Sequence, residues 1–204
     1  MVVIIDYGVG NLGSIQNMIS RIGVDSVISN RKEDLESASK LILPGVGNFA
    51  YGMQKLYDSN LIEILENLVF KEQIPILGIC LGAQLMCKFS EEGNINGLGW
   101  FDANVVKFNI LDVKSKFKIP HMGWTNLKIV KPSRIFTDID NNSRFYFVHS
   151  YHFVSDNYSI VAANANYYYD FASVLQLDNI FAVQFHPEKS HRYGIQLMRN
   201  FLFI

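Results

Sequence analysis

The chain has 204 residues, of which 49% are hydrophobic and 18% charged, which is typical of a globular domain and unlike a disordered polypeptide. Its 18 Lys and Arg residues nearly balance 19 Asp and Glu residues, so no strong positive field favours nucleic acid as a partner. No apolar run reaches the ~18 residues of a membrane span, and two cysteines are too few for a disulfide scaffold. The N-terminal residues lack a basic region and a cleavage site, so we expect no signal peptide. We therefore expect a single cytoplasmic domain over residues 1–204, with no membrane partner.

The first half of the chain predicts alternating strands and helices. Short apolar segments followed by turn-forming residues are typical of strands, and apolar residues at helical spacing are typical of helices. We expect strands at 2–5, 26–29, 40–43 and 76–79, and helices at 11–22, 52–57 and 61–70. Fully apolar strands in this alternation favour an α/β fold, with an open, mostly parallel sheet that carries helices on both faces.

From Gly97 onward the pattern changes to strand-like segments of an antiparallel or mixed region. These segments lie at 103–108, 127–130, 145–148 and 180–185. A last helix is expected from residue 192 to about 202, because Ile195, Met198 and Leu202 fall on one face. No internal repeat or linker-like tract supports a second domain.

The segment PILGICLGAQL, residues 75–85, carries the strongest chemical signal. An apolar strand runs into Gly78, Cys80 and Gly82, and an amphipathic helix is expected directly afterwards. This is the thiol form of a nucleophile elbow, in which a sharp strand-to-helix turn projects the nucleophile. The helix N-terminus favours thiolate over thiol. The flanking glycines therefore favour a nucleophile over a buried structural cysteine, whereas Cys87, inside the helix, is predicted to pack in the core.

The segment AVQFHPEKS offers a base and an orienting group for that thiol. His186 and Glu188 flank Pro187 at the end of another apolar strand. Open α/β sheets bind ligands at such strand ends, and a cysteine nucleophile needs a nearby base that a third group orients. We predict a catalytic triad of Cys80, His186 and Glu188.

These residues carry a family resemblance. GICLGAQ together with QFHPEKS resembles the class I, triad-type glutamine amidotransferases, over nearly the whole chain. PHMGW at 120–124 and YFVHSY at 146–151 are similar to one branch, the glutaminase subunits of imidazole glycerol phosphate synthase in histidine biosynthesis. The resemblance implies a flavodoxin-like α/β fold and hydrolysis of L-glutamine to L-glutamate and ammonia through a Cys80 thioester. It also implies a heterodimer with a (β/α)₈-barrel cyclase subunit, which receives the ammonia.

The resemblance also implies roles for individual residues. The oxyanion of the tetrahedral intermediate would be held by the backbone at Val46, Gly47 and Leu81. The bound glutamine would be held by Gly45, Gln84, Glu92, Ser150 and Tyr151. The partner would be met by Asn11, His121, Trp124 and Lys189. This chemistry needs no cofactor and no metal.

The segment VVIIDYGVGNLGS raises a competing interpretation. Gly8, Gly10 and Gly13 have the G-x-G-x-x-G spacing of a dinucleotide-binding loop. Such a loop also needs an acidic residue at the end of the second strand, where this chain has Asn30, Arg31 and Lys32. We therefore interpret the glycine segment as a turn beside the glutamine site, with no nucleotide bound.

Three alternatives stay open. Thr125 follows the tryptophan of PHMGW where the family usually has Asn, and SHRYGIQLMRNF near the C-terminus is similar to paralogues that supply ammonia for amidino-sugar synthesis in surface polysaccharide. A stand-alone γ-glutamyl hydrolase would leave PHMGW and Lys189 unexplained. A degenerate binding subunit would not need the three triad residues.

Overall fold

Five parallel strands form one half of the sheet in the structure, a computed structural model that describes residues 1–110 and 117–204. Their order is β2 (Ser26–Ser29), β1 (Val2–Ile5), β3 (Lys40–Leu43), β4 (Ile76–Ile79) and β13 (Ile180–Val183). All four strands predicted for the first half of the chain lie here with the predicted bounds. The mostly parallel α/β prediction is confirmed.

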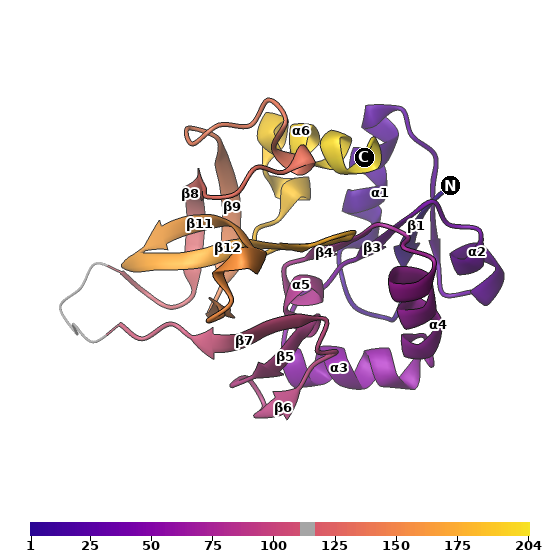
Figure 1. Ribbon diagram of the computed structural model, residues 1–204, viewed down its shortest axis with the longest axis horizontal. Coiled ribbons are helices and arrows are strands. Elements are labelled where there is room, and N and C mark those ends of the chain that lie inside the picture. The colour runs from indigo at the N-terminus through magenta and orange to yellow at the C-terminus, as the bar shows by residue number, and fades with distance from the viewer. Residues whose placement is uncertain (111–116) are drawn as a thin grey trace.

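Helices cover both faces of the parallel strands (Figure 1). Alternate residues of β1 point to opposite faces, so Val2 and Ile4 join one buried cluster and Val3 and Ile5 join the other. The first cluster is covered by α1 (Leu12–Ile22) and α6 (His191–Leu202). The second is covered by α2 (Lys32–Glu36), α3 (Phe49–Asp58), α4 (Ile62–Glu66), its π-helical continuation Asn67–Lys71, and α5 (Leu81–Leu85).

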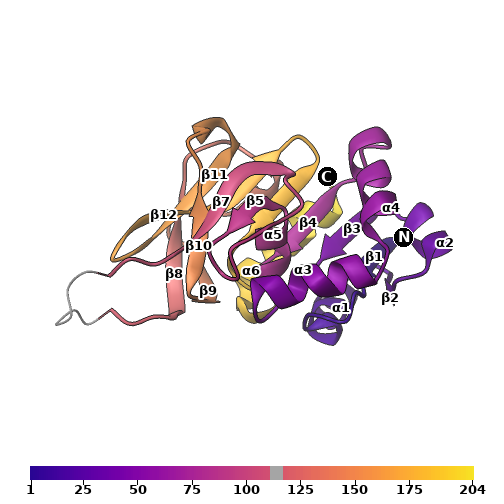
Figure 2. The same cartoon turned by 90° about the horizontal axis from the view of Figure 1, so that it is seen from below.

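The second half of the chain adds the predicted mixed region, which Figure 2 shows gathered at one end of the molecule. Strand β12 pairs antiparallel with β13, β10 and β11 and so joins the two halves. The added strands are β5 (Cys87–Ser90), β6 (Ile95–Asn96), β7 (Phe101–Lys107), β8 (His121–Ile129), β9 (Arg144–His149), β10 (Tyr151–Val154), β11 (Val161–Tyr167) and β12 (Tyr169–Leu177). Short 3₁₀ turns lie at Arg134–Phe136, Tyr158–Ile160 and Pro187–Lys189. Within the described residues, no helix is both long and apolar enough to cross a membrane.

The glycine segment near the N-terminus forms a turn between β1 and α1. Gly8 and Gly10 have φ angles of +83° and +124°, which favour glycine. A Cβ on Gly10 would lie 3.0 Å from the Cβ of Pro44, at the start of the next glycine-rich loop. A Cβ on Gly13, by contrast, would have no neighbour within 4 Å. The third glycine of a dinucleotide-binding loop serves close packing of helix on strand, and Gly13 makes no such contact.

Two of the helical glycines, Gly13 in α1 and Gly194 in α6, provide a matched test of this packing. Gly13→Ala should stabilise the protein by about 0.5–1 kcal/mol, because alanine restricts the unfolded chain and meets no neighbour. Gly194→Ala should destabilise it by about 1–3 kcal/mol, because the new Cβ would collide with the Pro187 carbonyl group. Urea unfolding of both variants measures the difference, and equal effects would contradict this account.

Candidate active site

Cys80 occupies a strained turn between β4 and α5. Its φ and ψ are 54° and −111°, a conformation that side chains other than glycine rarely adopt. The Cys80 N–H donates to the Val183 carbonyl at 2.8 Å, and the Gln84 N–H donates to the Cys80 carbonyl at 3.1 Å. The turn is thus tied to the neighbouring strand on one side and to the first turn of α5 on the other. This is the geometry of the predicted nucleophile elbow.

Three glycines allow the backbone to pack tightly around the elbow. A Cβ on Gly78 would lie 2.7 Å from the Cα of Ala83, and a Cβ on Gly82 would collide with the Leu43 carbonyl oxygen. Gly45 in turn packs on the backbone of Gly82, where a Cβ would collide with its nitrogen. The loop after β3 and the elbow therefore touch through backbone atoms, with no side chain between them.

His186 lies at the end of β13 and points its ring between two partners. Its Nδ1 is 2.7 Å from Oε1 of Glu188, and both side chains are only 2% exposed. Its backbone N–H donates to the Tyr146 carbonyl at 2.9 Å, and its carbonyl accepts the Ser190 hydroxyl at 2.6 Å. Cys80 is the other residue that acts on this side chain, and the two line the same cavity. The structure thus brings the three predicted triad residues together.

The electrostatics of this group favour a charged imidazole. Burial alone would lower the pKa of His186, but its hydrogen bonds and charge interactions with Cys80 and Glu188 outweigh burial and raise that pKa to about 10. Cys80 itself is 7% exposed, and Nε2 of Gln184 lies 3.9 Å from its sulfur. An imidazolium flanked by a carboxylate and a sulfur is the arrangement that activates a cysteine nucleophile.

A cavity of about 380 Å³ opens in front of Cys80 and His186. Residues from the loop after β3, the elbow, the stretch after β5, and the segment between β9 and β10 line it. Its other lining residues are Val46, Gly47, Leu81, Gln84, Glu92, Pro120, Val148, His149, Ser150, Tyr151 and Lys189. Seven of these are residues predicted for the oxyanion and the glutamine, whereas Gly45 lies behind this surface, packed on Gly82.

Comparison with known proteins agrees with the family resemblance seen in the sequence. The family model described as glutamine amidotransferase class-I matches residues 3–204. The chain belongs to this family. It is 48% identical over 202 residues to imidazole glycerol phosphate synthase subunit HisH 2 of Methanococcus maripaludis, covering 99% of this chain and 98% of that protein. It is 45% identical, with the same coverage, to imidazole glycerol phosphate synthase subunit HisH 2 of Pseudomonas aeruginosa.

Solved structures share the fold at lower identity. PurLQS from Thermotoga maritima matches with a TM-score of 0.76 at 15% identity, over 99% of this chain and 97% of that one. A glutamine amidotransferase from the same organism matches with a TM-score of 0.66 at 18% identity, over 99% and 82%. The mixed region therefore belongs to the amidotransferase fold.

The pocket of this amidotransferase is held by polar contacts that the sequence did not reveal. The Glu92 carboxylate accepts the Phe49 N–H at 2.8 Å, so its position is fixed at the N-terminus of α3. Nε2 of Gln84 donates to the Tyr151 carbonyl at 3.1 Å and to Oε1 of Gln184 at 3.0 Å. The Tyr7 hydroxyl donates to the Pro44 carbonyl at 2.6 Å, which ties the N-terminal glycine turn to the loop after β3. Burial and the nearby Cys80 raise the pKa of Tyr7, so it stays a donor.

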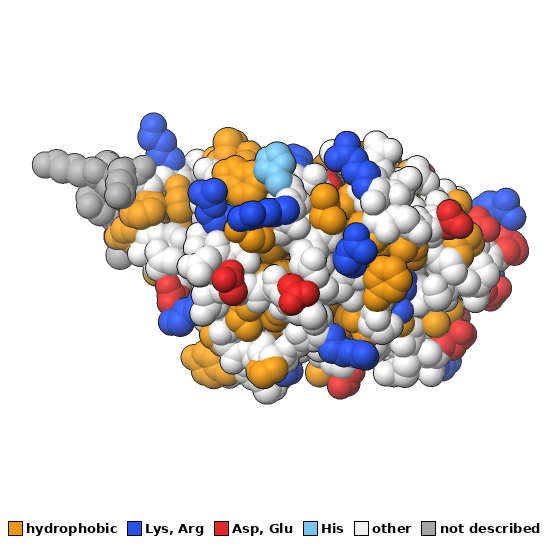
Figure 3. Space-filling view, turned by 90° about the horizontal axis from the view of Figure 1, so that it is seen from above, with side chains coloured by type: hydrophobic (Ala, Val, Ile, Leu, Met, Phe, Trp, Pro, Cys, Tyr) orange, Lys and Arg blue, Asp and Glu red, His pale blue; other side chains and the backbone are white. Residues whose placement is uncertain are grey.

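The predicted partner residues divide into exposed and buried ones. Asn11 and Lys189 are exposed, Trp124 is 42% exposed, and the Trp124 ring stacks on His191 at 5.2 Å. His121 does not belong to this surface: it is only 2% exposed, because it points inward from β8 while its neighbours point outward. The prediction that His121 contacts a partner is therefore wrong for its side chain. Figure 3 shows basic and hydrophobic side chains gathered around a histidine on one face.

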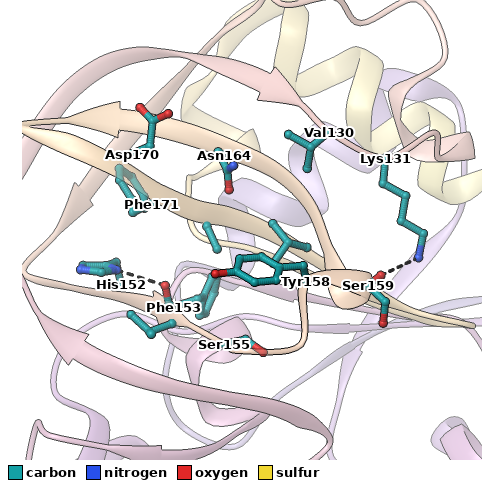
Figure 4. Close-up of a pocket in the computed structure, with 13 residues that line it drawn as sticks. Val130, Lys131, His152, Phe153, Ser155, Tyr158, Ser159, Asn164, Asp170 and Phe171 are labelled. Carbon is teal, nitrogen blue, oxygen red and sulfur yellow. Dashed lines mark hydrogen bonds between the residues drawn. The ribbon is translucent and has the colours of Figure 1, made fainter.

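A larger cavity, of about 750 Å³, lies away from the triad between β10, β11 and β12 (Figure 4). Several of its polar groups are paired within the protein: Lys131 Nζ donates to the Ser159 carbonyl, and Asp170 accepts from Asn166. His152 is paired with the Tyr169 hydroxyl at 2.9 Å. Size alone therefore does not locate the chemistry. Within residues 1–110 and 117–204, no group of three or more His, Cys, Asp or Glu side chains is placed to hold a metal ion.

The charge of His186 should depend on Glu188. Glu188→Gln removes the charge of one of the two residues that raise the pKa of His186, so that pKa should fall from about 10. Because the pKa of His186 is raised in the folded protein, the charged ring stabilises the fold fully below about pH 6.5. This stabilisation is lost as pH rises through about 10. NMR titration of the His186 ring in wild type and variant measures the shift. An unchanged pKa would show that Glu188 does not hold the charge.

Proposed function

We propose that the chain is the glutaminase subunit of an imidazole glycerol phosphate synthase, acting in the cytoplasm. It would hydrolyse L-glutamine to L-glutamate and ammonia, and pass the ammonia to a (β/α)₈-barrel cyclase subunit. The observation that carries this proposal is the buried Cys80–His186–Glu188 group at the edge of a glutamine-sized pocket. The near full-length similarity to HisH subunits supports the pathway, and two free cysteines suit a reducing compartment.

Catalysis begins with the Cys80 sulfur. It attacks the side-chain amide carbon of glutamine, and the carbonyl π electrons move to oxygen to give a tetrahedral intermediate. His186 then gives its proton to the amide nitrogen as the carbon–nitrogen bond breaks, which releases ammonia and leaves a thioester. Water adds to the thioester while His186 takes its proton, and the carbon–sulfur bond breaks to give glutamate. Glu188 keeps the ring oriented, since Oε1 is 2.7 Å from Nδ1.

The oxyanion is stabilised by backbone donors beside the sulfur. The Leu81 N–H opens α5, where helical N–H groups have no intrahelical partner. A second donor comes from Val46 or Gly47 in the exposed loop after β3. Gly47 has a φ of +97° and no neighbour within 4 Å of an added Cβ, so the adjoining peptide has room to reorient. This freedom makes the loop suitable for regulation by a partner.

The other end of glutamine is held at the far wall of the pocket. Glu92 lines this wall with its carboxylate anchored on Phe49, and suits the substrate ammonium group. The backbone at Ser150 and Tyr151 suits the substrate carboxylate. The Ser150 carbonyl is fixed by the Phe108 N–H at 3.0 Å, and the Tyr151 carbonyl by Gln84 at 3.1 Å. Gln84 therefore acts on this wall through the backbone.

Replacement of the nucleophile tests the chemistry. Cys80→Ala should lower glutamine turnover by the complex about 10⁴-fold or more, because no other group can form the thioester. Cys87→Ala is the control: its thiol is fully buried and 3.9 Å from the Ala83 carbonyl, so we expect full activity and a stability loss of about 1 kcal/mol. Glutamate release measures the turnover of both variants. Activity that survives Cys80→Ala would refute the assignment.

A second experiment tests the partner and identifies the acceptor. Trp124→Ala should weaken binding to a histidine-pathway cyclase about tenfold to thirtyfold, because large exposed aromatic residues dominate such interfaces. Tyr158→Ala is the control, since Tyr158 is 82% exposed beside the larger cavity. Isothermal titration with the purified cyclase and with a sugar-modifying barrel paralogue compares the acceptors. Preference for the paralogue would redirect the function to amidino-sugar synthesis, and binding to neither would contradict the heterodimer.

A further inference from the structure

A pair of buried histidines links the outer strand β8 to the wall of the active-site pocket. His121 and His149 face each other across β8 and β9, with Nδ1 of His121 3.0 Å from Nε2 of His149. Nε2 of His121 lies 3.0 Å from the Thr125 hydroxyl, and Nδ1 of His149 lies 2.7 Å from the Tyr151 carbonyl oxygen. The four groups form one continuous chain of hydrogen bonds. Neither ring takes part in the triad.

The direction of every hydrogen bond in this chain follows from its last acceptor. A carbonyl oxygen only accepts, so Nδ1 of His149 carries a proton. A neutral His149 then accepts at Nε2, which places a proton on Nδ1 of His121 and leaves its Nε2 to accept from the Thr125 hydroxyl. Burial lowers the pKa of His121 to about 4 and that of His149 well below its ordinary value, so both rings are neutral. The Tyr151 carbonyl thus sets the tautomer of both rings, and Thr125 supplies the donor that the buried Nε2 of His121 accepts.

The surroundings hold the His121 ring in the plane that this order requires. It stacks between Phe147, at 5.0 Å and 22°, and Tyr167, at 4.0 Å and 19°. Phe108 packs against both histidine rings, 6.2 Å from His121 and 5.2 Å from His149. Aromatic faces on both sides leave only the ring edge for polar contacts, which the Thr125 hydroxyl and His149 occupy.

The two ends of this chain of hydrogen bonds lie at the surface proposed for the partner and at the wall of the glutamine pocket. Thr125 adjoins Trp124, which is exposed on the surface proposed for the partner. The Tyr151 carbonyl, at the other end, also accepts from Gln84, which contacts Gln184 beside the Cys80 sulfur. His149 itself lines the pocket. A shift of β8 would therefore be transmitted through the His121 and His149 rings to the backbone at Tyr151, which lines the glutamine pocket.

We propose that His121 and His149 are positioning residues, which hold the glutamine-binding backbone at Ser150–Tyr151 in register with Thr125 on the partner-facing strand. The inference rests on the proposed glutaminase function. It also explains the departure noted at Thr125: asparagine, usual at this position in the family, likewise carries a donor for Nε2 of His121. The hydroxyl is the feature that matters, and the rest of the Thr125 side chain is replaceable.

The test removes the donor without changing the shape of residue 125. Thr125→Val should leave the buried Nε2 of His121 without a donor and loosen this ring from β8, which should raise KM for glutamine in the partner complex about threefold to tenfold with kcat changed less than twofold. Thr125→Ser and Thr125→Asn keep a donor and should restore wild-type KM. Thr137→Val is the matched control, because it removes a hydroxyl bonded to the Arg134 carbonyl on an exposed turn away from the pocket.

Two readouts separate this inference from a structural role and from the proposed function. Nitrogen-15 NMR of the ¹⁵N-labelled histidine rings in the isolated chain reads the tautomers directly, with signals assigned by substitution of each histidine. A wild-type ring that is not protonated at Nδ1, an unchanged His121 Nε2 signal in Thr125→Val, or an unchanged KM in that variant would overturn the proposal, as would a loss that Thr125→Ser fails to restore. If the wild-type complex hydrolyses no glutamine, the glutaminase assignment fails, whereas the tautomer order is still decided by the spectra.

Discussion

A residue other than glycine in the left-handed region costs on the order of 1–3 kcal/mol, and Cys80 carries this cost at a φ of 54°. The conformation persists because Gly78 and Gly82 let the backbone of α5 pack against β4 and the Leu43 carbonyl group. The same contact packs Gly45 on Gly82 and brings Val46 and Gly47 to the cavity that Cys80 lines. Nucleophile exposure and oxyanion-hole position are therefore consequences of one backbone packing.

The topology of the sheet brings the base to this elbow. Strands β4 and β13 are parallel neighbours with Ile79 opposite Val183, so both chains leave the sheet at the same edge. Cys80 follows immediately, and His186 comes three residues after Val183, where its N–H is bound by the Tyr146 carbonyl of β9. The parallel half thus supplies the reacting groups, and the antiparallel half supplies the walls that orient them. This division explains why the added strands are needed for a chemically complete site.

The sequence predicted the parallel strands and the triad well because both depend on local signals. Apolar runs ended by turns set the strand bounds, and Cys80 stands between glycines that only an elbow requires. His121 was placed wrongly because the expected strand began at residue 127, whereas β8 begins at His121. Counting back in twos from buried Leu127 would have turned His121 inward and Trp124 outward. The contact of His121 with His149, 28 residues away, depends on tertiary pairing, which no local pattern encodes.

One residue type serves two opposite purposes in this site, and the neighbouring charges decide which. His186 lies between a carboxylate and a sulfur, so its pKa rises to about 10 despite burial. Burial lowers the pKa of His149, and its hydrogen bond to the Tyr151 carbonyl raises it. The neighbouring rings of His121, His152 and His186 lower it further. The charge that activates Cys80 thereby helps to keep His149 neutral, and a neutral His149 is what gives the hydrogen bonds to Tyr151 and His121 a single direction. The charge of His186 is therefore coupled to the direction of the hydrogen bonds that His149 makes.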